Sequence, residues 1–372
     1  MSLTLPIKLD PAGDCSFSEA MSEALIAVLN WQARGCRGME APFSAALLER
    51  AALALPASPA LQVAFAPFAE LGQRALFEQA VALRWLAALH DLALERPSGD
   101  LAAAYPGPGR PGDAGAAWPH VLRAMETEAA RFAAFMEHEP QTNEVGRSAV
   151  LLGGFLTIAQ ETGLPLRLIE LGASAGLNQL WDQRRYRLGR TAAWGPADAR
   201  LTLETDWRGS APPLAAARVH SRAACDRKPI ALSDPAQRRR LTAYVWADQA
   251  DRLARLQAAI EETLAAGIGV QACDAVVFAK RRARPEPGVA TVVFHSVFLQ
   301  YMPLASQQAL ATILADAGAK AEPDAPFAWL RMEPAADSLA SMELRLTLWP
   351  DGRERLLATA HPHGAWVEWI GA

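Results

Sequence analysis

Lysine is scarce in this chain of 372 residues, and arginine supplies most of its positive charge. The formal net charge is −4 and the isoelectric point is near 6.0, so the sequence lacks the clustered basic surface that nucleic-acid binding requires. We therefore expect no nucleic-acid partner. About half of the residues are hydrophobic, which is enough to bury a sizeable core.

Long apolar runs and paired cysteine motifs are also missing. No window of 18 apolar residues occurs, so we expect no membrane span. The N-terminal stretch MSLTLPIKLDPAGDCS has no apolar signal core. The four cysteines, which have no metal or redox spacing, are Cys15, Cys36, Cys225 and Cys273. Together these absences predict a cytoplasmic protein with reduced thiols.

The first part of the chain has the periodicity of helices. FSEAMSEALIAVLNWQARG carries apolar residues at helical spacing and stops at Gly35, and three further stretches before residue 140 behave alike. Pro/Gly-rich breaks such as AYPGPGRPGDAGAA separate them. We expect an all-α N-terminal domain over residues 1–145.

From Pro165 onward, short apolar or alternating runs alternate with helical stretches. This pattern predicts βαβ units and a mainly parallel sheet. Around Pro350-Asp351-Gly352 two strands follow each other without a helix, which predicts a closing antiparallel hairpin. The expected fold of residues 146–372 is therefore α/β and Rossmann-like. The predicted strands are LRLIEL, ARLTLETDW, ARVHSRA, VVFA or a stretch near it, TVVFHSVF and FAWLRME. The predicted helices include AGLNQLWDQRRY and the stretch 234–266.

The first predicted strand ends in the sequence ELGASAG, residues 170–176. Glycines in a strand-to-helix turn allow positive φ and close approach of a ligand to the backbone. The free N–H groups at the start of the next helix favour an anion or an electron-rich ligand. Glu170, at the end of the strand, is placed to accept ribose hydroxyls or to orient a cationic ligand. These features favour a cofactor-binding turn, while a glycine turn that serves only packing stays open.

The same residues also match G-x-S-x-G, the nucleophile elbow of serine hydrolases, with Ser174 as the nucleophile. Such an elbow needs an oxyanion-hole loop from an earlier strand, and no strand is predicted before residue 166. An acid followed by a histidine does occur downstream, as Asp274 and His295, but several other pairs fit that order equally well. The elbow is the less favoured interpretation.

A dinucleotide-binding fold places an acid about 20 residues after the glycines. The acids near that distance here lie in a predicted helix or loop, not at a strand end. A first-strand acid, one glycine loop and a terminal hairpin resemble the class I S-adenosylmethionine-dependent methyltransferases. The resemblance implies that the cofactor is held by the loop and by three strand-end acids. In this sequence those positions are Glu170, Gly172, Ala173, Ser174, Gly176, Asp226 and Asp274.

A closer resemblance covers most of the chain. QTNEVGRSAVLLGGFL, IELGASAGLNQLWDQRRYRLG and LTAYVWADQADRLARLQAAI resemble DUF2332, a bacterial family of unknown function, as do ALRWLAALHDLAL and AAAYPG in the helical part. This resemblance implies the helical-plus-Rossmann organisation. The methyltransferase-like interpretation depends on fold analogy and on the loop chemistry.

Polar residues are concentrated in QTNEVGR, directly before a long apolar helix. Thr142 or Asn143 there is suited to cap the helix. If the segment folds over the glycine loop, Asn143 or Glu144 is placed to contact a ligand, and Arg147 to hold a carboxylate bidentately.

Three further residues are candidates for the site. His295 ends a predicted strand and Tyr301 follows it, which suits proton transfer because open α/β sheets bind ligands at the carboxyl ends of strands. A structural role for His295 stays open. Asn178 follows the glycine loop and is expected to face the pocket. The Glu137-His138-Glu139 and His361-Pro362-His363 runs lack zinc-ligand spacing, so we expect no metal site.

The leading hypothesis is therefore an S-adenosylmethionine-binding protein, a methyltransferase that acts on a small molecule or another acceptor, with His295 and Tyr301 as catalytic candidates. The first alternative is a protein that binds a nucleoside-like ligand without turnover. The second is a serine hydrolase that uses Ser174. The sequence does not set the oligomeric state, so a homo-oligomer stays open.

Overall fold

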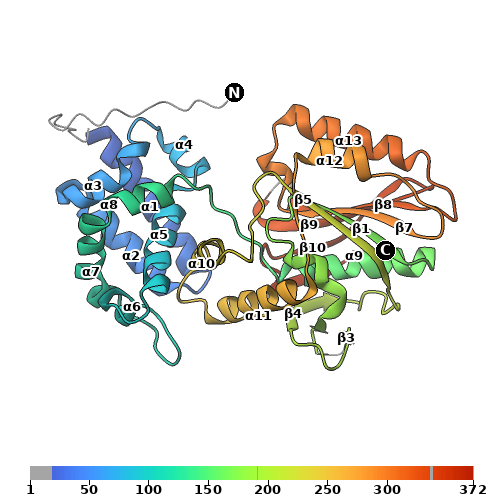
Figure 1. Cartoon of the computed structure of the whole chain (residues 1–372), viewed down its shortest axis with the longest axis horizontal. Coiled ribbons are helices and arrows are strands. Elements are labelled where there is room, and N and C mark those ends of the chain that lie inside the picture. Colours follow the sequence, from blue (N-terminus) through green and yellow to red (C-terminus); the bar gives the residue numbers. More distant parts are fainter. Residues whose placement is uncertain (1–18, 191, 336–337, 372) are drawn as a thin grey trace. The chain divides into compact units, whose positions relative to one another are not determined.

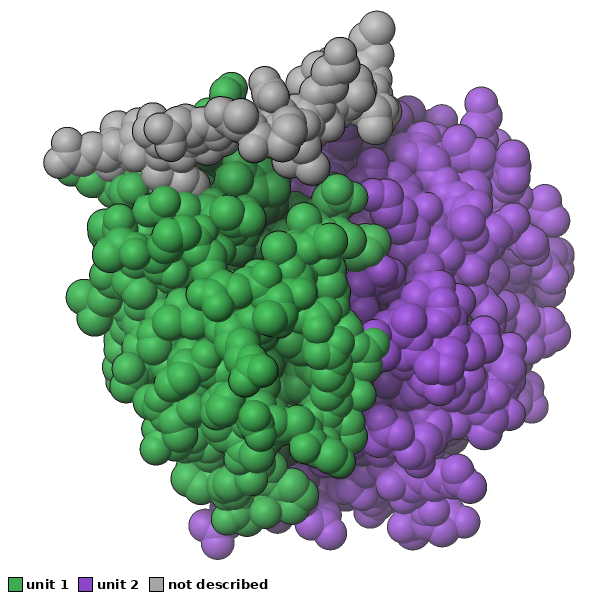
Figure 2. All heavy atoms as spheres, turned by 60° about the vertical axis from the view of Figure 1, so that its left-hand side comes forward, with its two compact units in different colours: residues 1–140, 243–250 green, residues 141–242, 251–372 purple. Residues whose placement is uncertain are grey.

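A computed structural model of the chain describes residues 19–190, 192–335 and 338–371 (Figure 1). The N-terminal stretch MSLTLPIKLDPAGDCS, which contains Cys15, lies outside these residues. The chain divides into two compact units, coloured green and purple in Figure 2. The first is Met1–Pro140 together with Ala243–Ala250, and the second is Gln141–Thr242 together with Asp251–Ala372. The helical unit therefore includes a short segment from much later in the chain.

Helices make up the first unit, as predicted, and the residues described before Leu166 form no β-strand. α5 is buried over nearly its whole length, because its apolar residues extend around the helix. Among the described residues no single helix is long and apolar enough to cross a bilayer, although one sharply bent helix pair, Pro42–Ala57 with Pro59–Phe68, passes that test jointly. The helices are α1 Glu19–Gly38, α2 Pro42–Ala54, α3 Pro59–Phe65, α4 Gln73–Glu78, α5 Val81–Glu95, α6 Asp100–Ala104, α7 Ala114–Thr127 and α8 Ala129–Met136.

The later segment is fixed in the helical unit by polar contacts. Asp248 caps α2, since its carboxylate accepts hydrogen bonds from Phe43 N at 2.8 Å and from Ser44 Oγ at 2.7 Å. The buried His90 lies with Nδ1 2.9 Å from Val245 O. These bonds satisfy the first turn of α2, so residues 243–250 are part of the core of this unit.

The second unit is built on one mixed sheet with strand order β3-β2-β4-β11-β10-β9-β8-β7-β1-β5-β6. Strands β6, β5, β1, β7 and β8 are mutually parallel, and β9 and β10 then continue as antiparallel neighbours. The α/β prediction and the antiparallel pair around Pro350 are confirmed. The prediction that this pair closes the sheet was wrong, because β11, β4, β2 and β3 lie beyond β10. The strands are β1 Leu166–Leu171, β2 Arg185–Leu188, β3 Ala192–Trp194, β4 Thr202–Gly209, β5 Val219–Asp226, β6 Gln271–Ala272, β7 Ala290–Ser296, β8 Phe327–Ala335, β9 Ser338–Trp349, β10 Arg353–Ala360 and β11 Trp366–Trp369.

Helices cover both faces of the sheet, as Figure 1 shows. α9 packs on one face, where Gly153 and Gly154 allow close approach: a Cβ on either would lie 2.3 Å from Trp369 or Leu330, respectively. α12 and α13 pack on the other face with the apolar side chains of β1, β5 and β7. The helices of this unit are α9 Arg147–Thr162, α10 Pro235–Ala243, α11 Ala250–Ala266, α12 Ala275–Arg282 and α13 Leu304–Gly318.

Two predicted elements differ in the structure. The strand expected at or near VVFA is the short β6, just before it, and VVFA itself is the first half of α12, because Asp274 caps the helix that begins there. AGLNQLWDQRRY is not a crossover helix: it forms a 3-10 helix, η3 Leu177–Gln183, and then enters β2. Strands β2, β3 and β4 therefore lie between β1 and β5 in the chain and extend the far edge of the sheet. The helical stretch 234–266 is also divided, into α10 and α11.

Candidate functional site

The carboxyl ends of the parallel strands share one edge of the sheet, where open α/β folds bind their ligands. β10 runs parallel to β8, so the loop that follows Ala360 lies at the same edge. The strand order reverses between β1 and β7, since β5 and β6 lie on one side of β1 and β8 on the other. The loops after β1 and β7 therefore flank the expected ligand crevice.

The loop after β1 adopts left-handed backbone conformations. Gly172, Ser174 and Gly176 have φ values of 66°, 53° and 77°. The first and last are glycines, which adopt this conformation freely, whereas Ser174 carries a side chain at a strained position. Such strain indicates a loop whose shape is imposed by its surroundings.

Those surroundings are hydrogen bonds to the loop amides. Ser174 N donates to Asp226 Oδ2 and Leu177 N to Asn143 Oδ1, both at 2.9 Å, and Gly176 N donates to Ala173 O at 2.8 Å. The expectation that free N–H groups at a helix start would face a ligand is wrong for these amides. They hold the loop in shape instead.

The two predicted strand-end aspartates lie where the sequence places them. Asp226 ends β5, and its second oxygen accepts from Lys228 N at 2.8 Å, so each oxygen has one backbone partner. Asp274 follows β6 and caps α12 through Oδ1, which accepts from Val276 N at 2.9 Å and from Val277 N at 3.2 Å. Each carboxylate oxygen can accept more than one hydrogen bond, so both acids keep acceptor capacity.

Glu170 is buried beneath the loop. Gln179 Nε2 donates to its Oε2 at 2.8 Å. Burial raises the pKa of Glu170 to about 8, against the smaller lowering effects of Gln179 and Arg184. The carboxyl group is therefore mainly protonated at neutral pH, and its observed contact braces the segment that follows the loop.

The QTNEVGR segment reaches the glycine loop, but not as a cap of α9. Gly146 is the N-cap, without a side-chain bond, and Asn143 instead accepts from the loop amide of Leu177. Glu144 is buried, and Arg252 donates to its Oε2 at 2.6 and 2.9 Å. Burial opposes ionisation, but Arg252 outweighs it and lowers the pKa of Glu144 to about 2.

The loop His361-Pro362-His363 joins this segment, although sequence analysis gave it no role at the site. A Cβ on Gly146 would lie 2.2 Å from His363 O, so the two segments touch through their backbones. Burial lowers the pKa of His363 to about 3, which keeps the ring neutral. The sequence signal that could have placed this loop at the site is its position directly after a strand, β10.

The structure gives both ring nitrogens of His295 a partner. Trp329 Nε1 donates to Nε2 at 2.9 Å, so the ring proton lies on Nδ1, which donates to Glu333 Oε1 at 2.6 Å. Glu333 also accepts from the amides of Phe298 and Leu299. His295 is fully buried, and this geometry suits a structural brace better than the predicted proton transfer. Tyr301, by contrast, is 67% exposed.

Several buried polar atoms near the loop have no hydrogen-bond partner within the described residues. They are Ser174 Oγ, Asn178 Oδ1, Gln179 Oε1 and Trp181 Nε1, all within eight residues of one another. An unsatisfied buried polar group costs about 1–3 kcal/mol, so such a concentration calls for a missing partner. A polar ligand or an internal water would supply one.

The room left by the loop glycines is taken by neighbouring side chains. A Cβ on Gly172 would lie 2.2 Å from the Phe298 ring, and one on Gly176 would lie 2.9 Å from Val270. Phe298 follows β7, on the other side of the expected crevice. A ligand that lies against Gly172 therefore needs the Phe298 ring to turn away.

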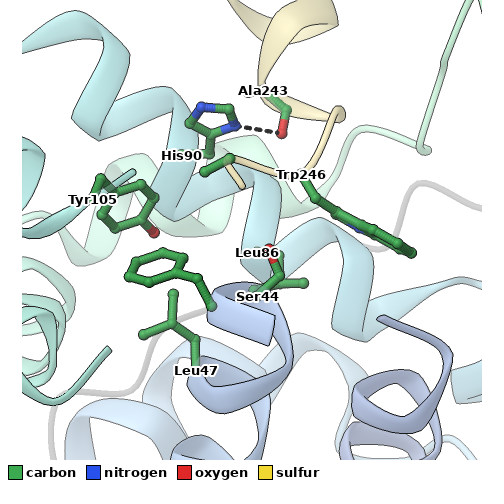
Figure 3. Close-up of a pocket in the computed structure, with 9 residues that line it drawn as sticks. Ser44, Leu47, Leu86, His90, Tyr105, Ala243 and Trp246 are labelled. Carbon is green, nitrogen blue, oxygen red and sulfur yellow. Dashed lines mark hydrogen bonds between the residues drawn. The ribbon is translucent and has the colours of Figure 1, made fainter. Parts of the chain in front are cut away.

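A separate hollow lies in the helical unit, where the hydroxyl of Tyr105 points toward the space beside His90 and Ser44 (Figure 3). The hydroxyl is buried and has no partner in the described part of the chain. The cavity measures about 10 Å³, which is room for about one water molecule. Its size excludes it as a ready-made substrate site.

The described residues contain no group of three or more His, Cys, Asp or Glu side chains able to hold a metal ion. Cys36, Cys225 and Cys273 are free thiols. Burial raises the pKa of Cys225 to about 12, so this thiol is a poor nucleophile at neutral pH. The chemistry of the site therefore depends on its carboxyl, amide, hydroxyl and guanidinium groups.

Fold and site together define an α/β protein with a large, mostly parallel mixed sheet, an N-terminal helical region and a polar cluster at the carboxyl edge of the sheet. The sequence matches the family described as uncharacterized protein conserved in bacteria (DUF2332) over residues 27–369. The chain belongs to this family. Comparison with curated proteins and with solved structures gives no match.

Proposed function

We propose that the chain binds S-adenosylmethionine at the loop Gly172–Gly176 and is a methyltransferase for a small-molecule or other acceptor. We also infer that β6-β5-β1-β7-β8 is a Rossmann-like sheet of the class I methyltransferase type, in which this loop lies at the point where the strand order reverses. The observation that supports the proposal most is the pair of buried atoms beside the loop, Ser174 Oγ and Asn178 Oδ1, that have no hydrogen-bond partner among the described residues.

The polar groups present fit such a ligand. Asp226 holds the loop with one lone pair of Oδ2 and keeps others for ribose hydroxyls. Ser174 and Asn178 offer the partnerless atoms, and Asp274 lies at the end of β6 for the base. A ligand can occupy the space over Gly172 only after the Phe298 ring turns away.

When bound, S-adenosylmethionine supplies a methyl group on a sulfonium, which reacts without covalent help from the protein. The task of this chain is then to position donor and acceptor and to exclude water. The strained loop, held by Asp226 and Asn143, is suited to positioning because its amides are fixed before a ligand arrives.

The test is calorimetric titration with S-adenosylmethionine and S-adenosylhomocysteine. Gly172→Ala places a Cβ against Phe298 and is expected to weaken binding at least about 10-fold, because the crevice narrows. Gly163→Ala is the matched control: Gly163 has nearly the same φ, 65° against 66°, but a Cβ there meets nothing within 4 Å. No wild-type binding at millimolar ligand would sink the proposal, as would equal binding by the two variants.

A second candidate, binding of a nucleoside-like ligand without turnover, is favoured by His295. Both of its ring nitrogens are engaged, which leaves the predicted base without a free nitrogen. Ligand binding without methyl transfer to a broad panel of acceptors would support this candidate.

The serine hydrolase alternative finds little support. Ser174 Oγ is buried and has no hydrogen-bonded base in the described part of the chain. A fluorophosphonate probe that labels the wild type but not Ser174→Ala would restore it.

A further inference from the structure

Arg147 is the first residue of α9, and its guanidinium is fixed by backbone carbonyls. Nε donates to Pro362 O at 3.0 Å, and Nη1 lies 3.5 Å from Ser296 O at the end of β7. The loop that carries Pro362 is itself pinned, because a Cβ on Gly364 would lie 2.1 Å from Gly146 O. The direction of the guanidinium is therefore set before any ligand binds.

No carboxylate of the described residues lies within 4.0 Å of this guanidinium, although two carboxylates act on it from farther away. Glu144 accepts both of its short charged hydrogen bonds from Arg252. Glu333 accepts from His295 and from the amides of Phe298 and Leu299. Both neighbouring carboxylates therefore accept hydrogen bonds from groups other than Arg147.

Burial lowers the pKa of Arg147 because its cation is poorly solvated. Among the described residues, the hydrogen-bond acceptors of the guanidinium are the neutral carbonyls of Pro362 and Ser296. A partly buried cation of this kind gains more from a charged acceptor than an exposed one does. The planar guanidinium fork matches a carboxylate geometrically. Nearby Glu144 and Glu333 would oppose a divalent phosphate more strongly than a monovalent carboxylate.

We propose that Arg147 is a carboxylate-recognition residue at this edge of the sheet and pairs with a carboxylate of the bound ligand. That carboxylate belongs either to the amino-acid end of the nucleoside ligand or to the acceptor. The inference rests on the proposed function only for where the ligand lies, because the carboxylate site can be tested without a nucleoside.

The test uses calorimetry on the full chain with S-adenosylhomocysteine and with 5′-methylthioadenosine, which lacks the amino-acid end. Sodium succinate, compared with sodium chloride at equal ionic strength, is the third probe, read as a shift in melting temperature. The variant is Arg147→Lys, which keeps the charge but loses the fork. Arg187→Lys is the control, since Arg187 is an exposed arginine on β2.

If the ligand's own carboxylate pairs with Arg147, S-adenosylhomocysteine binds the wild type about 10- to 100-fold more tightly than 5′-methylthioadenosine. Arg147→Lys then removes that difference without weakening 5′-methylthioadenosine. If the acceptor supplies the carboxylate, the two nucleosides bind alike, and succinate stabilises the wild type and the Arg187→Lys control but not Arg147→Lys.

Succinate binding that depends on Arg147, with no nucleoside binding, would uphold the carboxylate site and refute the proposed function. Equal responses of Arg147→Lys and Arg187→Lys to every probe would overturn the carboxylate site. If Arg147→Lys does not fold, the affinities of the wild-type protein for S-adenosylhomocysteine and for its methyl ester are compared instead. Equal affinity for acid and ester, with no effect of succinate, overturns the inference.

Discussion

Two glutamates at the same edge of the sheet are buried to a similar extent and behave in opposite ways. Glu144 is 7% exposed and pairs with Arg252, and its pKa falls to about 2. Glu170 is 3% exposed and is held by the amide of Gln179, and its pKa rises to about 8. Burial is common to both, so the charged partner decides the state of each carboxyl group.

The hydrogen-bond partners around the two glutamates also differ. Around Glu144 the contacts are charged and paired, which braces the loops. The hydrogen-bond partner of Glu170 is the neutral amide of Gln179, and within the described residues Ser174, Asn178 and Gln179 each have a buried atom without a hydrogen-bond partner. Unsatisfied polar groups in an otherwise satisfied fold are typical of functional positions. The comparison therefore supports the proposal that a ligand binds nearer to Glu170, while the contacts of Glu144 provide structural support.

The largest expected effect is that of Glu144→Gln, which removes the buried carboxylate that accepts two hydrogen bonds from Arg252. Breaking a buried ion pair costs about 3–5 kcal/mol, measured as the free energy of unfolding in urea at pH 7. The native pKa of Glu144 is below its usual value, so its stabilisation is present above about pH 4.5 and is lost as the pH falls toward 2. Adding Arg252→Gln should recover part of the loss; unchanged stability in the single variant would contradict the assignment.

The contribution of Glu170 to stability should have the opposite pH dependence, and Glu170→Gln tests it. The native pKa of Glu170 is raised, so its effect on stability is most favourable below about pH 4.5 and worsens as the pH rises toward 8. Relative to the wild type, the variant should gain about 3 kcal/mol between pH 5 and pH 8. Urea unfolding at both pH values measures this gain, and a variant that parallels the wild type would show that Glu170 ionises normally.

Ser174→Ala should stabilise the ligand-free protein by about 1 kcal/mol, because it removes a buried hydroxyl that has no hydrogen-bond partner in the described part of the chain. The matched control is Ser148→Ala. Ser148 is also buried, but its hydroxyl donates to Val145 O at 2.7 Å and accepts from Arg184 Nη1 at 3.3 Å. That substitution should destabilise by about 1–3 kcal/mol in the same urea assay. Similar losses in both variants would show that Ser174 has a partner in solution.

The smallest effect is expected for Glu204→Gln at the exposed ion pair with Arg187. The two side chains are 67% and 65% exposed, so the pair should contribute less than about 1 kcal/mol. Urea unfolding at low and high salt checks this value. A loss as large as that of Glu144→Gln would remove the distinction between buried and exposed pairs.

Much of the fold could be predicted from local sequence. β1, the glycine loop and the helical first part follow from periodicity and turn residues. The strand expected at or near VVFA was misplaced by a few residues, because four apolar residues fit a strand or a helix equally; the deciding signal was the capping residue Asp274. The helix prediction for AGLNQLWDQRRY was wrong because tertiary contacts favour the turn into β2, among them the ion pair of the fully buried Arg184 with Glu262.

The candidate site was predictable only in part. Strand-end residues such as Glu170 and Asp226 are visible in a sequence because strands imply a shared edge. Arg252 and His363 interact with Glu144 although they lie more than 100 residues away in the sequence, and no local sequence pattern predicts such an interaction. Sequence also gave no sign that Trp329 occupies the free nitrogen of His295.

The return of residues 243–250 to the helical unit has a consequence for synthesis on the ribosome. Asp248, which caps α2, is made about 100 residues after Pro140, a delay of roughly 5–20 s at usual elongation rates. During that interval the nascent helical unit lacks both this cap and the carbonyls that face His90. The N-terminal half therefore completes its fold only after part of the sheet has been translated, and the two units mature together.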